Sequence, residues 1–246
     1  MMKKVTVAGI VLLFVFGFGE MALCEPLKIG TMYPFSGGGA LIGEEQWRGA
    51  EVARIVRNQK GGVAGRLVEF VKADIPDVSA AKSEAERLVN QLGLKLLTGT
   101  MSSSLSLAAT EVAARAGVIY WEHAAISDLI TGRGYKTIYR SGPNSAAMSK
   151  AQIRFIKEWL APQMKKMPSE VRLGLVYEDS AYGSSLAKNA EEAAKEAGIA
   201  VVSNVPYNAQ AVDLTSVILR LKKDRPDVLI GVGYVNDSIL LGRQAK

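Results

Sequence analysis

Short apolar segments alternate with longer amphipathic segments through most of this chain, and this alternation restricts the possible folds more than any other feature. Apolar residues at positions 81, 85, 88, 89 and 92 have the spacing of one helix face packed on a sheet. In the first half we expect strands at residues 27–32, 67–73, 95–99 and 118–121, and helices at 44–58, from 78 onward and at 107–116. Regular alternation indicates an α/β protein with helices on both faces of a parallel sheet.

The same alternation starts again after residue 171. We expect strands at residues 172–177, 199–205 and 227–233, and helices at 149–164, 180–196, 214–223 and from 237 onward. Both series open with a strand, a loop that contains Gly43 or Gly183, and a helix, which suggests two similar units. We therefore predict two doubly wound parallel-sheet lobes, at residues 25–143 and 144–246, divided near Gly142.

The first 24 residues have the layout of a secretory signal peptide. Lys3 and Lys4 precede an apolar run over residues 5–18, and Cys24 ends a stretch of small and apolar residues. The run is shorter than the roughly 20 residues that a membrane-spanning helix needs, which favours a removable signal over an anchor. We expect export to the periplasm, with cleavage after Cys24. The alternative is a lipoprotein anchored through Cys24.

Composition excludes several classes of protein. The 30 Lys and Arg residues are scattered among 24 Asp and Glu residues, so we expect no nucleic-acid partner. The single Cys and the single His, His123, cannot form an internal disulfide or a structural zinc site. We expect no metal and no cofactor.

No segment carries a complete catalytic motif. The glycines of residues 38–43 have a phosphate-loop spacing, but Glu44 and Glu45 follow them and would repel a phosphate. No nucleophile elbow accompanies His123. Glu122 beside it is a candidate general base, but no second carboxylate completes a mechanism, so we expect no catalytic residues and interpret Glu122 as a surface charge or a ligand contact.

Polar groups cluster where predicted strands end. Ser102, Ser103 and Ser104 lie at a strand-to-helix junction, where hydroxyls and N–H groups can accept a carboxylate; the alternative is that one serine only caps the helix. Tyr182 and Tyr234 follow strands of the second series. Ligands of doubly wound sheets bind beyond the carboxyl ends of the strands.

These positions, taken with others along the chain, resemble the type I periplasmic binding proteins of ABC transporters, in particular the branched-chain amino acid receptor group. The residues that carry the resemblance are Ile29-Gly30, Ser36-Gly37, Gly43, Trp47-Arg48-Gly49-Ala50, Lys60-Gly61-Gly62-Val63, Gly65, residues 99–104, Arg133-Gly134-Tyr135, Tyr182-Gly183, Asp213-Leu214, Arg225-Pro226-Asp227 and Gly233-Tyr234. Their order and spacing together carry the resemblance.

The resemblance implies two α/β lobes that close on a ligand in the cleft between them. It assigns the ligand's carboxylate to Ser103 and to backbone groups near Ala124, and it implies that Tyr182 and Tyr234 close over the ligand. The implied ligand-binding set is Ser36, Ser102, Ser103, Ser104, Glu122, Ala124, Ala125, Ile126, Tyr182 and Tyr234.

Two departures from the family pattern leave the ligand open. Ile126 replaces a threonine that would bind the carboxylate, and Trp121-Glu122-His123 replaces a proline-containing stretch. The acidic residue that receives an ammonium group would lie beyond Lys246, so Glu122 is a candidate substitute. The ligand is leucine-like, or another small carboxylate or amide.

The resemblance implies an exported, non-enzymatic receptor that delivers a small polar metabolite to an ABC permease. One alternative is the ligand-sensing ectodomain of a signalling receptor. Another is a secreted α/β enzyme that uses Glu122 and His123. We also expect the chain to be truncated, because residues 240–246 stop inside a predicted helix with no following strand.

Overall fold

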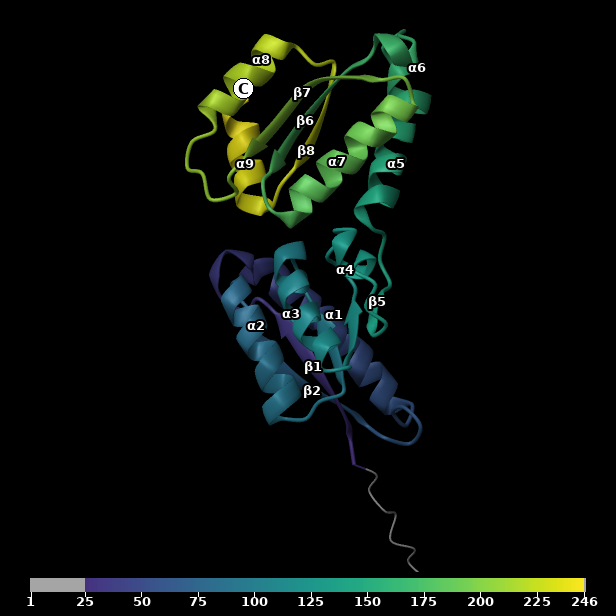
Figure 1. Ribbon diagram of the computed structural model, residues 1–246, viewed down its shortest axis with the longest axis vertical. Coiled ribbons are helices and arrows are strands. Elements are labelled where there is room, and N and C mark those ends of the chain that lie inside the picture. The colour runs from purple at the N-terminus through teal and green to yellow at the C-terminus, as the bar shows by residue number, and fades with distance from the viewer. Residues whose placement is uncertain (1–24, 246) are drawn as a thin grey trace, which may run out of the picture.

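The computed structural model describes residues 25–245, and it contains two parallel sheets, one above the other in Figure 1. We call residues 25–143 the N lobe and the remaining described residues the C lobe. The predicted signal peptide and its cleavage after Cys24 lie outside the described residues. Within the described part, no helix has both the length and the apolar surface that crossing a membrane requires.

The N lobe is built on a five-stranded parallel sheet in the order β2-β1-β3-β4-β5. Its elements are β1 (Leu27–Tyr33), η1 (Gly37–Gly39), α1 (Ala40–Gln59), β2 (Val68–Asp74), α2 (Val78–Glu86), η2 (Arg87–Gln91), β3 (Leu96–Gly99), α3 (Ser103–Arg115), β4 (Ile119–Glu122), α4 (Leu129–Gly132) and β5 (Ile138–Arg140). Because β1, β3 and β4 are neighbours in this parallel sheet, their carboxyl ends lie side by side.

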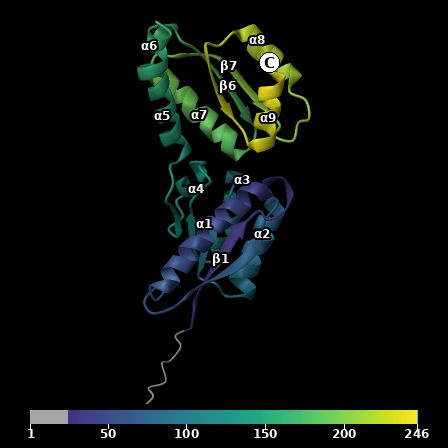
Figure 2. The ribbon, with the colours of Figure 1, turned by 180° about the vertical axis from the view of Figure 1, so that it is seen from behind.

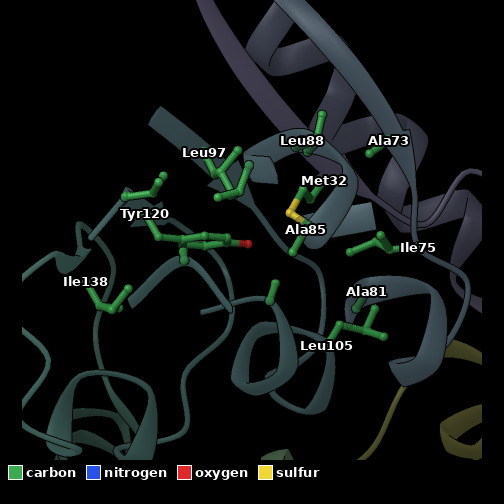
Figure 3. Close-up of a cluster of buried hydrophobic side chains, with 14 of the residues drawn as sticks. Met32, Ala73, Ile75, Ala81, Ala85, Leu88, Leu97, Leu105, Tyr120 and Ile138 are labelled. Carbon is green, nitrogen blue, oxygen red and sulfur yellow. The ribbon is translucent and has the colours of Figure 1, made fainter. Parts of the chain in front are cut away.

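Helices cover both faces of this sheet, as the alternation predicts. Helices α2 and α3 pack on the face seen in Figure 1, and α1 lies on the opposite face, which Figure 2 shows. Figure 3 shows the core under α2 and α3, where Met32, Leu97 and Tyr120 from the strands meet Leu88 and Ala85. The small alanines bring α2 close to the sheet, so the larger side chains fill the space without large voids.

The C lobe has a three-stranded parallel sheet in the order β7-β6-β8. Its elements are α5 (Ser145–Phe155), η3 (Ile156–Leu160), α6 (Ala161–Gln163), η4 (Pro168–Glu170), β6 (Arg172–Glu178), α7 (Ala181–Glu196), β7 (Ala200–Tyr207), α8 (Thr215–Asp224), β8 (Val228–Val232) and α9 (Val235–Gln244). Helices α5 and α7 lie on one side of the sheet, and α8 and α9 lie on the other (Figures 1 and 2).

Helix ends follow local chemistry. Asn144 caps α5 by accepting a hydrogen bond from the backbone N–H of Ala147 at 2.9 Å, and Asp77 caps α2 in the same way at 2.8 Å. Gly117 and Gly198, where we predict helices to stop, have φ of 66° and 73°, which glycine adopts without strain. The short α4 and β5 are not among the predicted elements, and α3 begins four residues before the predicted start.

Within the described residues, the last strand of the N-lobe sheet, β5, ends at Arg140, and α5 begins at Ser145. The lobes also touch beside this crossing from β5 to α5. The Asp128 carboxylate accepts hydrogen bonds from Asn189 Nδ2 at 2.5 Å and from Ser185 Oγ at 3.4 Å, both on α7. These contacts hold the crossing side of the two lobes together.

Candidate ligand site between the lobes

A cavity of about 560 Å³ lies between the two lobes, and we call it the interlobe cavity. Its lining comes from α1, the loops after β3 and β4, α5, and the starts of α7 and α9. The lining residues are Ile42, Gln46, Met101, Ser103, Ala124, Ala125, Ile126, Met148, Tyr182, Gly233, Tyr234, Val235 and Ser238. None of these described lining residues carries a formal charge.

The three serines after β3 have different positions. Ser102 is the N-cap of α3, where its Oγ accepts a 3.4 Å hydrogen bond from the backbone N–H of Leu105. Ser103 is buried and lines the interlobe cavity, and its Oγ accepts from the backbone N–H of Ser127 at 3.1 Å. Its hydroxyl proton remains available as a donor. Neither Ser102 nor Ser104 is among the lining residues.

Glu122, at the end of β4, is fully buried and points away from the cavity lining. Its carboxylate accepts hydrogen bonds from the backbone N–H groups of Thr100 (3.1 Å), His123, Ala124 and Ala125 (2.9 Å each), and from Ser106 Oγ (2.5 Å) and Thr100 Oγ1 (3.3 Å). Burial raises the pKa of Glu122 to about 7, although the hydrogen bonds from Ser106 and the backbone oppose that rise.

The backbone N–H groups of the loop after β4 therefore donate to a side chain of the protein itself. Ala124, Ala125 and Ile126 line the interlobe cavity, but the N–H groups of Ala124 and Ala125 donate to Glu122. These are the backbone groups that the family resemblance assigns to a ligand carboxylate. Arg140 holds the other side of the loop, because its guanidinium donates to the carbonyl oxygens of Ala125 (3.2 Å) and Ser127 (2.7 Å).

The C lobe contributes a pair of tyrosines to the cavity. The rings of Tyr182 and Tyr234 lie with centroids 5.4 Å apart and planes inclined by 50°. Burial raises the pKa of both phenols, and the nearby carboxylate of Glu178 adds to the rise. Both hydroxyls therefore stay protonated near neutral pH and can donate hydrogen bonds.

Close packing behind the tyrosines explains the glycine at position 233. A Cβ atom there would lie 2.4 Å from the Tyr207 hydroxyl and 2.6 Å from Oδ2 of Asp237. Those two groups are themselves hydrogen-bonded at 2.8 Å. The loop that carries Tyr234 therefore passes directly over a buried polar pair.

Ser36 lies outside the interlobe cavity lining. Its Oγ donates to the Asp74 carboxylate at 2.7 Å, and its backbone N–H donates to the same carboxylate at 3.2 Å. This arrangement ties the loop after β1 to the end of β2.

Several lining residues are missing from the sequence-based set. Ile42 and Gln46 come from α1, Met101 from the loop after β3, Met148 from α5 and Ser238 from α9. Oε1 of Gln46 is buried without a hydrogen-bond partner among residues 25–245. The polar spacing of α1 gives no sign that Gln46 faces inward, because only the packing of the helix on the sheet sets that direction.

A second cavity, of about 540 Å³, lies between α1 and the sheet of the N lobe. Its lining is mainly apolar and includes Phe70, Trp121 and His123. Nε2 of His123 is 2.8 Å from the Tyr33 hydroxyl, and burial lowers the pKa of His123. The His123 ring and the Glu122 carboxylate thus have separate partners, and no hydrogen bond joins the two side chains in the described structure.

Comparisons with known proteins find similarity to periplasmic binding proteins. The model of the periplasmic binding protein family matches residues 26–246. A Leu/Ile/Val-binding protein homolog 8 of Brucella abortus (strain 2308) is 39% identical over 225 residues, which cover 92% of this chain and 56% of the relative. The chain therefore spans little more than half the length of this relative.

Solved structures of similar fold include binding proteins with different ligands. The branched-chain amino acid transporter substrate-binding protein LivJ of Streptococcus pneumoniae, in complex with isoleucine, has a TM-score of 0.74 at 23% identity, over 89% of this chain and 60% of that one. A solute-binding protein of an ABC transporter from R. palustris, in complex with benzoate, has a TM-score of 0.77 at 20% identity, over 89% and 59%. At these identities the likeness shows the shared fold.

Proposed function

The chain belongs to the periplasmic binding protein family, and from that membership we propose that it is the exported substrate-binding component of an ABC transporter, without catalytic activity of its own. One observation carries the proposal. The interlobe cavity is lined by both lobes, with the Ser103 hydroxyl on one side and the tyrosine pair Tyr182 and Tyr234 on the other. Such a cavity suits a ligand that the lobes enclose by moving together.

We propose a small polar metabolite as the ligand: a branched-chain amino acid or a related amino acid, amide or carboxylate. Three features support this class. The B. abortus relative is named for Leu, Ile and Val, and the two structural neighbours hold isoleucine and benzoate. The cavity of about 560 Å³ has apolar walls with a few hydroxyls, which matches a ligand with an apolar body and a polar end.

Within the proposed site, Ser103 donates to the ligand's polar end, and the two tyrosines cover its apolar body. Ala124, Ala125 and Ile126 form the floor by van der Waals contact. Ser102 caps α3, and its side chain also hydrogen-bonds to the Tyr234 phenol of the C lobe, whereas Ser36 acts through Asp74 on the loop after β1. Ser104 is the second residue of α3 and follows Ser103 directly.

The remaining parts of the proposal concern the protein's surroundings. We propose that the ligand is passed to a membrane permease of the ABC type and that the protein works in the periplasm, either free or anchored through Cys24. The family name and the layout of residues 1–24 support this placement.

Direct binding measurements test the function. The protein expressed from its complete gene should show ligand-dependent thermal shifts in a panel of aliphatic amino acids, their amides and aromatic acids. Calorimetry should then give one site per chain for the best compound. Uptake of that compound should fall in a strain that lacks the gene. Absence of binding across the panel, by a protein that melts cooperatively, would contradict the proposal.

A further inference from the structure

The loop after β4 encloses its own anion. Four backbone N–H groups and two hydroxyls converge on the Glu122 carboxylate at 2.5 to 3.3 Å. Successive N–H groups that point into one concavity form an anion-binding nest. Here the occupant of the nest is a side chain of the same loop, and it is fully buried.

This occupied nest lies directly behind the floor of the interlobe cavity. Ala124 and Ala125 line the cavity, and their N–H groups donate inward to Glu122. A ligand carboxylate on this floor would find these N–H groups directed inward to Glu122. It would be repelled by the buried charge, because like charges interact strongly where water is excluded.

Other charged groups near the cavity do not reverse this effect. Arg140 is near enough to interact with the Glu122 charge, but its guanidinium donates to the carbonyl oxygens of Ala125 and Ser127 and does not line the cavity. On the opposite side, Glu178 is buried behind Tyr182, and Asp237 is buried behind Gly233. Buried carboxylates thus stand behind both walls of a cavity whose described lining is uncharged.

We infer that Glu122 is a specificity-determining residue: its carboxylate takes up the N–H groups of the cavity floor and places a buried negative charge behind it, so the site favours a ligand that presents a neutral amide or hydroxyl group to the N lobe. This inference rests on the proposed function and narrows its ligand class. The Ser103 hydroxyl donates to the carbonyl oxygen of such an amide. A site built for one hydrogen-bonding pattern discriminates strongly against a ligand that leaves buried groups unpaired or repelled.

Matched ligand pairs test the inference in the protein expressed from its complete gene. The probes are benzamide with benzoate, and isoleucinamide with isoleucine, titrated by calorimetry at pH 8. The pKa of Glu122 is raised to about 7, so at pH 8 its carboxylate is largely ionised. The titratable side chains that interact with its charge are Tyr33, Tyr120 and Arg140. The amide of a pair that binds should bind at least tenfold more tightly than its carboxylate.

A variant that lacks the Glu122 charge provides the second part of the test. Glu122→Gln keeps the size of the side chain, and it should reduce the amide-to-carboxylate affinity ratio by about tenfold or more. Asp74→Asn is the matched control, because Asp74 also ends a strand and accepts loop N–H groups, but lies outside the cavity lining. It should leave the ratio unchanged.

The outcomes separate the two proposals. Equal or tighter binding of the carboxylate by the wild-type protein would overturn the inference and leave the proposed function standing, and this result needs no variant. The inference would also be overturned if Glu122→Gln folds and leaves the amide-to-carboxylate affinity ratio unchanged. Failure of all four probes to bind would contradict the proposed ligand class and the inference with it.

Discussion

At the scale of single residues, two neighbouring polar side chains have opposite roles. Ser103 lines the interlobe cavity, whereas the Glu122 carboxylate is buried in the protein interior. Glu122 ends β4, and Ser103 begins α3 just after the loop that follows β3; β3 and β4 are adjacent parallel strands. Which of them meets a ligand depends on side-chain direction and not on position along the chain.

Ser103→Ala should weaken ligand binding, because it removes a donor from the cavity wall. We expect a loss of about 0.5–1.5 kcal/mol for a neutral ligand acceptor and about 1.5–3 kcal/mol for a charged one. Ser104→Ala is the control, since Ser104 is the next residue of α3 but does not line the cavity. Calorimetry on both variants decides the assignment; equal affinities for the two variants would show that Ser103 makes no ligand contact.

The raised pKa of Glu122 should make stability depend on pH. Burial raises the pKa from 4.5 to about 7, so the folded protein retains a proton that the unfolded chain has lost between these two values. The contribution to the free energy of unfolding is therefore full below about pH 4.5 and falls as pH rises through 7, by roughly 3 kcal/mol.

Urea denaturation of the wild-type protein and of Glu122→Gln at pH 5 and pH 8 measures this contribution. His123 acts in the opposite direction, because its lowered pKa favours folding as pH rises. The difference between the two proteins cancels the His123 contribution. If that difference did not change between pH 5 and pH 8, Glu122 would not titrate as proposed.

At the scale of elements, the two lobes use the same device to start a helix beside a strand. A Cβ atom at Gly43 would lie 1.9 Å from the carbonyl oxygen of Pro34, and one at Gly183 would lie 1.9 Å from the carbonyl oxygen of Glu178. These are the two glycines that follow the first strand of each series in the sequence. Their shared role is close approach of the helix start to the preceding loop.

Gly183→Ala should therefore destabilise the C lobe and shift the start of α7, which carries Tyr182. The contact is with backbone, which cannot rotate away, so we expect a loss of about 1–3 kcal/mol. Gly49→Ala, within α1, meets no atom within 4 Å and should be neutral or stabilise by up to about 1 kcal/mol. Chemical denaturation of both variants provides the comparison, and similar stabilities would contradict the packing argument.

At the scale of the whole molecule, the lobes are joined on one side and separated by the interlobe cavity. Asp128, Ser185 and Asn189 connect the lobes near the crossing between β5 and α5. The tyrosine pair lies on the C lobe, so under the proposed function movement of that lobe would bring the rings over a ligand. This arrangement favours hinge closure upon binding.

Small-angle scattering of the protein expressed from its complete gene should show a smaller radius of gyration at saturating ligand. Tyr182→Ala should weaken both binding and closure, because it removes aromatic surface that the ligand would cover. Tyr139→Ala is the control, since the Tyr139 ring stacks on Trp121 outside the interlobe cavity. An unchanged radius with binding confirmed by calorimetry would mean that a rigid cavity takes up the ligand.

The order of strands and helices and the parallel α/β class could be predicted from hydrophobic patterning, and the family from the resemblance. The order of elements follows from local signals: hydrophobic periodicity, a helix start after Asp77, and the helix-ending glycines Gly117 and Gly198. The sequence did not predict α4 and β5, because each of these elements is too short to show a clear hydrophobic period.

The polar groups that face the cavity could not be predicted from the sequence. The inward turn of Glu122 depends on loop N–H groups that converge after β4 has paired with β3. The entry of Ile42 and Gln46 into the lining depends on how α1 packs against the sheet. Both arise from contacts between segments distant in the chain, and local sequence patterns carry no information about the direction of a side chain that such contacts set.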